Sequence, residues 1–294
     1  MRVTKLADVE ARPRRVAVGE FDGVHNGHRE VIRGSDTVLT FEPHPLQVIR
    51  PEAAPKLLTS FERKEELIAQ LGVGELVVIP FDQRFAAQTP QEFIDEVLVR
   101  RLLATHVSVG ENFRFGHRAA GDTATLLADE RFQTRVVPLV EIEGEIVSSS
   151  HIRALIQAGD VELSGRMLGA PFELRGEVVA GDRRGRELGF PTANIVPDEA
   201  LVHPGHGVYV ARADGDCAAV SVGVRPTFGT GRALLIEAYL LDREVDLYGR
   251  VLRVEFLKRL RGERRFESVD ELVEQMHRDV ARTRELCRLL ASST

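Results

Sequence analysis

Short apolar runs alternate with helical patterns along the first half of the chain. Five runs rich in Val, Leu and Ile are bounded by turn residues, which predicts buried β-strands at 16–19, 37–41, 76–79, 106–110 and 135–140. Thr59 and Thr89, each with Glu three residues later, start predicted helices at about 61–71 and 90–103. This rhythm predicts a parallel sheet with helices on both faces, in which ligands bind at the carboxyl ends of the strands.

The pattern changes after Ser148. Two short helices, 152–157 and 161–168, precede a strand-like region with many glycines. We expect its strands at 176–180, 207–213, 218–222, 234–241 and 251–257. Short strands separated by turns predict a small antiparallel barrel, and a capping box at 268–271 starts a final helix that we expect to pack on it. We therefore predict two domains, 1–168 and 169–294.

The composition is that of a globular protein of enzyme size. The chain has 294 residues, 43% of them apolar, which is enough to form more than one hydrophobic core. Its 39 basic and 45 acidic side chains give a net charge of −6, which argues against broad capture of nucleic acid or of an anionic membrane. No apolar run approaches the ~18 residues of a membrane span, and residues 1–15 lack the apolar core of a signal peptide.

Only two cysteines are present, Cys217 and Cys287, and they lie far apart in the sequence. We therefore expect neither a disulfide framework nor a zinc site with four thiolate ligands. This cysteine usage fits a reducing, cytoplasmic location.

A segment rich in Gly and His, reading G-E-F-D-G-V-H-N-G-H, follows the first predicted strand directly. Gly23 and Gly27 let the backbone approach a ligand, and His25 and His28 can donate hydrogen bonds to phosphate oxygens beside the N-terminus of a helix. This context predicts a phosphate site. The alternatives are a turn with two solvated histidines and a metal site formed by Asp22 and the two histidines.

A second segment, rich in Gly and Arg, lies at 181–194. Its glycines free backbone N–H groups that can bind phosphate. Thr192 and Asn194 lie two residues apart on an extended chain, so their oxygens can point at one Mg²⁺ ion. The alternative interpretation is a solvated basic turn.

The first of these segments, Gly19 to His28, resembles the HxGH signature of nucleotidyltransferases in the form used by bacterial FAD synthetases. Residues 41–45, 109–116 and 147–153 resemble further motifs of that family, in the expected order. The resemblance implies a Rossmann-like domain that transfers adenylate from ATP to FMN, with His25 and His28 as catalytic residues. It also implies nucleotide or phosphate contacts by Gly19, Phe21, Asp22, Gly23, Gly27, Ser149, Ser150 and Arg153, and flavin contacts by Asn112 and Phe113.

The segment 181–194 resembles the GxxxGxxLGFPTAN signature of riboflavin kinases, whose fold is a small six-stranded antiparallel barrel. Residues 221–229 and 242–249 resemble further motifs of that family, with Ser221 where the family usually has Asn. Phosphorylation of riboflavin starts from a hydroxyl nucleophile, so a general base is needed. The resemblance implies that Glu237 is this base, and the remaining implied contacts are Gly181 and Gly185 with phosphate, Thr192 and Asn194 with phosphate and Mg²⁺, and Arg225 with flavin. Without the resemblance, an outward-facing glutamate on a half-exposed strand is the better explanation of Glu237.

The two resemblances together imply a bifunctional enzyme that makes FMN from riboflavin and then FAD from FMN. Its partners would be riboflavin, FMN, ATP and Mg²⁺, with no nucleic acid and no membrane, and the sequence gives no oligomeric state.

Residues 29–37 form a short first crossover, in which we expect a single helical turn, because a parallel crossover normally takes a dozen or more residues. Because this crossover is short, one alternative stays open: a riboflavin kinase with an inactive or differently specific nucleotidyltransferase domain. A barrel that binds single-stranded nucleic acid is the alternative from another class, and the negative net charge and the absence of Trp count against it.

Overall fold

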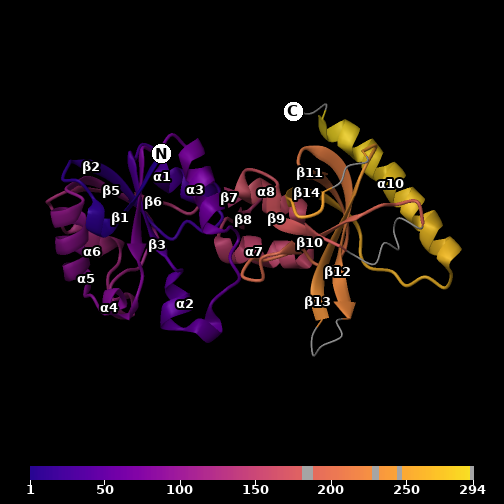
Figure 1. The fold of residues 1–294 in the computed structure, drawn as a ribbon. Helices are drawn as coiled ribbons and strands as arrows, with labels where there is room; N and C mark the ends of the chain where they lie inside the picture. Colours follow the sequence, from indigo (N-terminus) through magenta and orange to yellow (C-terminus); the bar gives the residue numbers. More distant parts are fainter. Residues whose placement is uncertain (181–187, 227–231, 244–246, 292–294) are drawn as a thin grey trace. The chain divides into compact units, whose positions relative to one another are not determined.

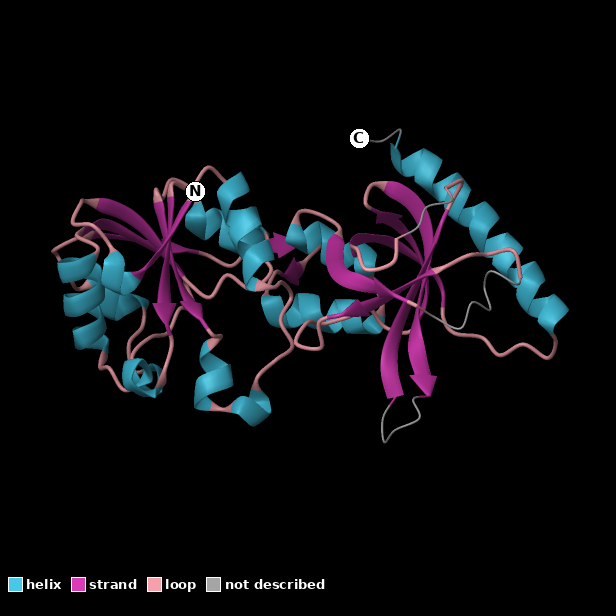
Figure 2. Ribbon diagram, in the orientation of Figure 1, coloured by secondary structure: helices cyan, strands magenta, loops and turns pink. Residues whose placement is uncertain are grey.

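The computed structural model describes residues 1–180, 188–226, 232–243 and 247–291 (Figure 1). The chain divides into two compact units, Met1–Ser149 and Ser150–Thr294, each built on its own sheet (Figure 2). The functional boundary at 168/169 stays a prediction. Gly181 and Gly185, which are predicted to contact phosphate, lie outside the described residues.

The first unit is built on a six-stranded sheet in the order β1-β4-β3-β2-β5-β6, with every pairing parallel. The strands are β1 (Arg2–Lys5), β2 (Arg14–Val18), β3 (Thr37–Glu42), β4 (Glu75–Pro80), β5 (Ala104–Gly110) and β6 (Gln133–Val137). The predicted parallel α/β fold is confirmed, although β1 was missed because this short edge strand has no buried apolar run. The strand order changes direction between β2 and β5, and ligands of such sheets bind at that point.

Helices cover both faces of this sheet. The helices of this unit are α1 (Asn26–Ile32), α2 (Pro45–Ile49), α3 (Phe61–Gln70), α4 (Gln83–Ala86), α5 (Pro90–Glu92), the π-helix η3 (Phe93–Arg101) and α6 (Thr123–Leu127). Alternate residues of β2 point to opposite faces, so Val16 and Val18 join one hydrophobic cluster with η3 and α6. Ala17 joins the other, with α1 and α3. A small hairpin, β7 (Glu141–Ile142) and β8 (Glu145–Ile146), ends the unit.

The first crossover is longer than predicted. Helix α1 has seven residues and starts at Asn26, before the segment 29–37, in which residues 29–32 form the single turn that was expected. The connection runs from the end of β2 at Val18 to the start of β3 at Thr37, and the loop before α1 contributes much of its length. The crossover therefore meets the usual requirement of a dozen or more residues.

The described part of the second unit forms a closed antiparallel barrel in the order β10-β13-β12-β11-β14-β9. Its strands are β9 (Phe172–Val179), β10 (Ala193–Pro197), β11 (Gly207–Ala213), β12 (Asp216–Pro226), β13 (Arg232–Leu240) and β14 (Val251–Arg261). The predicted barrel is confirmed. Helices α7 (Ser149–Ala158) and α8 (Val161–Leu168) come before it, and α8 packs on β9 and β14.

The last helix, α10 (Val269–Ala291), lies against β11 and β12, as predicted (Figure 1). Ser268 caps it by accepting a hydrogen bond from the Glu271 N–H, 3.1 Å long. Among the helices of the described ranges, none is long and apolar enough to cross a bilayer.

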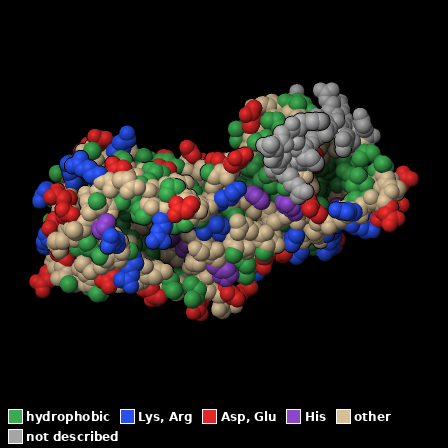
Figure 3. Space-filling view, turned by 90° about the horizontal axis from the view of Figure 1, so that it is seen from below, with side chains coloured by type: hydrophobic (Ala, Val, Ile, Leu, Met, Phe, Trp, Pro, Cys, Tyr) green, Lys and Arg blue, Asp and Glu red, His purple; other side chains and the backbone are tan. Residues whose placement is uncertain are grey.

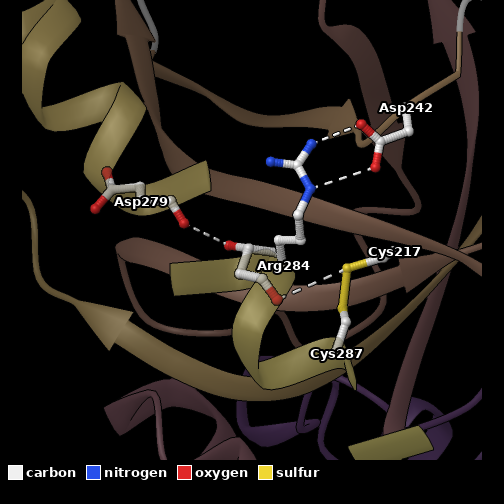
Figure 4. Close-up of a disulfide and its surroundings, with 6 residues drawn as sticks. Cys217, Asp242, Asp279, Arg284 and Cys287 are labelled. Carbon is white, nitrogen blue, oxygen red and sulfur yellow. Dashed lines mark hydrogen bonds and ion pairs between the residues drawn. A yellow bond between two sulfur atoms is a disulfide. The ribbon is translucent and has the colours of Figure 1, made fainter. Parts of the chain in front are cut away.

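Cys217 and Cys287 form a disulfide, which corrects the expectation that the chain has no disulfide framework (Figure 4). They are 70 residues apart in sequence, but α10 returns along the barrel and brings their Cα atoms to 6.3 Å. An ion pair of 2.6 Å between Arg284 of α10 and Asp242 lies beside the disulfide (Figure 4). Distance along the chain was a poor guide, because the terminal helix folds back onto the start of β12.

Removing this disulfide should destabilise the second unit. Closing a 70-residue loop restricts the unfolded chain, which is worth about 4 kcal/mol in the chain-entropy treatment. We expect the reduced protein and Cys287→Ser to unfold at a lower temperature than the oxidised protein in circular-dichroism melts. Reductant should leave the Cys287→Ser melt unchanged, and equal melting of the oxidised and reduced wild type would contradict this prediction.

Candidate active sites

The loop that follows β2 has a tight and fixed conformation. Phe21, Gly23 and Val24 have positive φ values of 56°, 83° and 42°, a region that is strained for side chains other than glycine. Phe21 and Val24 are fully buried, so packing in the core stabilises their strained backbone. Gly19 begins the loop with an N–H that donates to the Leu39 carbonyl, 3.1 Å away.

Two other segments hold this loop in place. Asp22 Oδ1 accepts hydrogen bonds from the backbone N–H groups of Leu58, at 2.8 Å, and Thr59, at 3.3 Å. Thr59 Oγ1 in turn accepts a hydrogen bond from the Gly23 N–H, at 3.2 Å. Ser149 Oγ donates to the Asp22 carbonyl oxygen, at 3.0 Å. The loop is therefore fixed to the segment before α3 and to the start of α7.

The cap of α3 differs from the predicted one. Ser60, not Thr59, is the N-cap, and its Oγ accepts a hydrogen bond from the Arg63 N–H at 3.2 Å. The hydroxyl of Thr59 is used on the loop after β2 instead. The capping box predicted at Thr89 and Glu92 is confirmed.

His25 and His28 stack at the start of α1. Nδ1 of His25 accepts a hydrogen bond from the His28 backbone N–H at 3.3 Å, so the proton of a neutral His25 ring is on Nε2. The two ring centroids are 3.5 Å apart, and Phe21 lies edge-on to His28. A Cβ at Gly27 would come within 3.2 Å of the His25 ring, so glycine makes this close approach possible.

Burial keeps both imidazoles neutral near pH 7. It lowers the pKa of His25 to about 4, and burial together with the charges of His25 and Lys64 lowers the pKa of His28 well below its usual value. Nδ1 of His28 is buried and makes no hydrogen bond within the described part of the chain. A neutral imidazole offers one N–H donor, so this pair can hydrogen-bond a phosphate without neutralising its charge.

The two alternatives for this segment find no support. His25 is only 6% exposed, which excludes a solvated turn. Asp22 Oδ1 and His25 Nδ1 already accept backbone hydrogen bonds, so these atoms are not directed at a metal. Over the ranges that the structure describes, no three His, Cys, Asp or Glu side chains are grouped as metal ligands.

A buried pair of Glu and Lys side chains that the sequence analysis missed lies close to the histidines. Lys64 of α3 is 2% exposed, and its Nζ donates to Glu20 Oε1 at 3.0 Å. Burial raises the pKa of Glu20 to about 8, against the opposing effect of Lys64, and the nearby Asp22 and Glu42 raise it further. The available signal was a lysine at a buried position of an amphipathic helix.

The other residues predicted to act in the first half lie in two places. Asn112 and Phe113 follow β5, next to the point where the strand order reverses; Asn112 is exposed and Phe113 stacks on Phe115. Ser150 and Arg153 lie on α7 and belong to the second compact unit.

In the barrel, Asn194, Glu237 and Ser221 lie side by side on β10, β13 and β12. Glu237 is the direct cross-strand partner of Asn194 on one side and of Ser221 on the other. Direct partners point to the same face of a sheet, with Cβ atoms about 4.5–5.5 Å apart. Ile236 and Ala238 fill the barrel interior, so this row of three side chains is on the outer face.

Asn194 is 7% exposed, and its Oδ1 makes no hydrogen bond with any described residue. Thr192 is two positions earlier, and Phe190 contacts both Tyr239 of β13 and His277 of α10. The sequence pattern gave no signal for His277, because only the fold brings α10 to this face. Arg225 lies in β12, and its side chain is outside the described part.

The surface charges are mixed. On the face shown in Figure 3, blue Lys and Arg side chains alternate with red Asp and Glu over the described residues of both units. The electrostatic groove of a nucleic-acid-binding barrel is formed by clustered positive charge. This face therefore gives no support to the nucleic-acid alternative.

Glu20 should make the first unit less stable as the pH rises. Its pKa is about 8 in the folded protein against 4.5 without the fold, so the folded state binds the extra proton between these values. The free energy of unfolding therefore falls as the pH rises from 4.5 to about 8, by at most about 1.4 kcal/mol per pH unit. Glu20→Gln cannot ionise and should unfold at a higher temperature than wild type at about pH 8.5, but not at about pH 5. Identical pH dependence of the two melting curves would exclude this role of Glu20.

Comparison with known proteins gives two matches in the order of the two units. Residues 8–151 match the family model described as FAD synthetase, and residues 168–287 match the one described as riboflavin kinase. A solved structure described as a macrolide-efflux protein from Streptococcus pneumoniae has a TM-score of 0.88 and 32% identity, covering 97% of this chain and 99% of its own.

Curated relatives match over almost the whole chain. The bifunctional riboflavin kinase/FMN adenylyltransferase of Bacillus subtilis (strain 168) is 37% identical, covering 90% of this chain and 89% of the relative. The protein of the same name from Escherichia coli (strain K12) is also 37% identical, covering 92% and 91%. The chain therefore belongs to the family of bifunctional riboflavin kinases/FMN adenylyltransferases.

Proposed function

We propose that the second half of this chain phosphorylates riboflavin to FMN and that the first half adenylylates FMN to FAD, with His25 and His28 acting in adenylylation and Glu237 in phosphorylation. The observation that carries the first assignment is the stacked, neutral histidine pair beside the point where the strand order reverses. The second assignment is carried by the row of Asn194, Glu237 and Ser221 on the outer face of the barrel.

Adenylylation starts from a nucleophile that is already charged. An FMN phosphate oxygen attacks the α-phosphorus of ATP, the bond from that phosphorus to the bridging oxygen of the β-phosphate breaks, and pyrophosphate leaves. No general base is required, so the site has to position the reactants and stabilise the charge that develops. Nε2–H of His25 is a fixed donor for a phosphate oxygen, and Gly23 and Gly27 let the backbone come close. Ser149, Ser150 and Arg153 bind the triphosphate, while Asn112 and Phe113 contact the flavin.

Phosphorylation starts from a neutral ribityl hydroxyl. Its oxygen attacks the γ-phosphorus of ATP, the bond to the bridging oxygen of ADP breaks, and the hydroxyl proton moves to the Glu237 carboxylate. Glu237 is partly exposed on the outer face of the barrel, so substrate can reach it. Arg225 contacts the flavin in this scheme.

The donors around Asn194 fit Mg²⁺. Its buried Oδ1 lacks a hydrogen-bond partner among the described atoms, and an amide oxygen is a ligand that Mg²⁺ accepts. Thr192 and Asn194 would hold the ion, which neutralises charge on the phosphate oxygens of ATP when bound.

We assign both reactions to the cytoplasm, the compartment that supplies ATP. Because Cys217 and Cys287 form a disulfide, this assignment rests on the supply of ATP and not on the cysteine usage.

Substituting one residue in each half should separate the two reactions. His28→Ala removes a donor from the adenylylation site and should lower the rate of FAD formation from FMN by about 100-fold or more. Glu237→Gln removes the base and should lower the rate of FMN formation from riboflavin by about 100-fold or more. Chromatography of the flavins after incubation with ATP and Mg²⁺ measures both rates.

Each variant is the control of the other, since each should keep the reaction of the unaltered half. If His28→Ala lowers FMN formation as much as FAD formation, the assignment of His28 to adenylylation is wrong. If Glu237→Gln lowers FAD formation from FMN as much as FMN formation from riboflavin, the assignment of Glu237 to phosphorylation is wrong.

Asn194→Ala should raise the Mg²⁺ concentration that the kinase reaction needs for half of its full rate. The reason is the loss of one oxygen ligand. The test is the rate of FMN formation over a range of Mg²⁺ concentrations at fixed ATP, with FAD formation from FMN as the control in the same protein. An unchanged half-saturating concentration would show that Asn194 does not bind the ion.

A further inference from the structure

The adenylylation site lacks a source of positive charge in its histidines. Both imidazoles are neutral near pH 7 because burial lowers their pKa values. The reaction nevertheless brings the triphosphate of ATP and the phosphate of FMN together. A positive group within the site would stabilise this charge, and a buried one acts in a low dielectric where its effect is large.

Lys64 is in the right place. Its N–H donates to the Ser60 carbonyl at 2.9 Å, so Lys64 lies one helical turn after the cap of α3. The residues just before that cap, Leu58 and Thr59, are bonded to Asp22. The bonds that fix the loop after β2 therefore also fix Lys64 against Glu20, and its charge acts on His28.

A second buried cation in the first unit shows what a purely structural ion pair looks like. Arg14, at the start of β2, lies against Glu75, which also accepts hydrogen bonds from Arg2 and Arg12. Both carboxylate oxygens of Glu75 are bonded, and these arginines hold its pKa below the usual value despite burial. Arg14 belongs to the opposite, amino end of the strands, away from the loop that carries the histidines.

The pair of Glu20 and Lys64 differs from that network in its hydrogen bonds and in the direction of the carboxyl pKa shift. Glu20 has one hydrogen bond through Oε1, and Oε2 is buried without a partner inside the described part. Burial raises its pKa to about 8, and the carboxylates of Asp22 and Glu42 that face it add to this, so Glu20 is mostly protonated near pH 7. A protonated carboxyl is a weak partner for an ammonium group, whereas a phosphate oxygen is a strong one.

We propose that Lys64 is a further catalytic residue of adenylylation. Its ammonium group is hydrogen-bonded to Glu20 in the free enzyme and bonds to a phosphate oxygen of ATP when the nucleotide binds. The proposal rests on the assignment of adenylylation to the site of His25 and His28. In it, Glu20 is a positioning residue that acts through Lys64.

The test compares variants of the full chain in the conversion of FMN to FAD. Lys64→Met keeps the length of the side chain and removes its charge, and it should lower kcat/KM for ATP by about 10- to 100-fold, the value of a charge-assisted hydrogen bond. Lys64→Arg keeps a cation and should recover most of this loss. Arg63→Met removes a cation from the neighbouring position of α3, where Arg63 pairs with Glu66, and should have no effect.

A double variant separates catalysis from a structural role. If Lys64 serves only to pair with Glu20, the neutral pair of Lys64→Met with Glu20→Gln should restore adenylylation to the level of Glu20→Gln alone. If Lys64 binds phosphate, the double variant should stay as slow as Lys64→Met. The kinase rate of the same molecules, expected to be unchanged, reports that the second unit is intact. The double variant leaves no unpaired carboxylate in the first unit if Lys64→Met folds poorly.

The outcomes distinguish this proposal from the one on which it rests. The role of Lys64 is overturned if Lys64→Met adenylylates FMN at the full rate or if the double variant recovers adenylylation. If His28→Ala has lost adenylylation in the same experiment, the assignment of the site still stands. Full adenylylation by His28→Ala would overturn the assignment of the site itself.

Discussion

The conformation of the loop after β2 in the nucleotidyltransferase half depends on the hydrogen bonds of the Asp22 carboxylate. This carboxylate binds two backbone N–H groups at the start of the segment that leads into α3, while Ser149 binds the Asp22 carbonyl. These bonds stabilise a loop whose backbone is strained at Phe21 and Val24. The stacked histidines lie at the end of this loop, and Lys64 lies one helical turn after the segment whose N–H groups bind Asp22. The hydrogen bonds of Asp22 therefore fix the positions of both the histidine pair and the buried Lys64 side chain.

The two halves of the chain solve different chemical problems, and the described side chains reflect this. Adenylylation uses an anionic nucleophile, and the site proposed for it combines neutral imidazoles with a buried lysine. Phosphorylation uses a hydroxyl, and the site proposed for it presents Glu237 between Asn194 and Ser221 on the barrel wall. Helix α10 lies against the barrel, where the disulfide and the Arg284–Asp242 ion pair hold it.

Much of this arrangement could be predicted from the sequence, and the exceptions share a cause. Buried apolar runs and capping boxes are local, so the strands β2 to β6 and the helices α3 and α10 were predicted. Relations across the chain were not: the disulfide depends on α10 folding back, and the hydroxyl of Thr59 is used on a loop 36 residues away. Lys64 stands at a buried position of an amphipathic helix, which is a local signal, but only the fold shows that Glu20 is its partner. The register that places Asn194 beside Glu237 likewise comes from the barrel alone.

The most direct test of the central claim is product analysis of the wild-type chain supplied with riboflavin, ATP and Mg²⁺. Chromatography should show FMN first and then FAD, with pyrophosphate released in an amount equal to the FAD formed. FMN that accumulates without FAD or pyrophosphate would contradict the account, because the loop after β2 would then hold its histidines and its buried lysine without catalysing adenylylation.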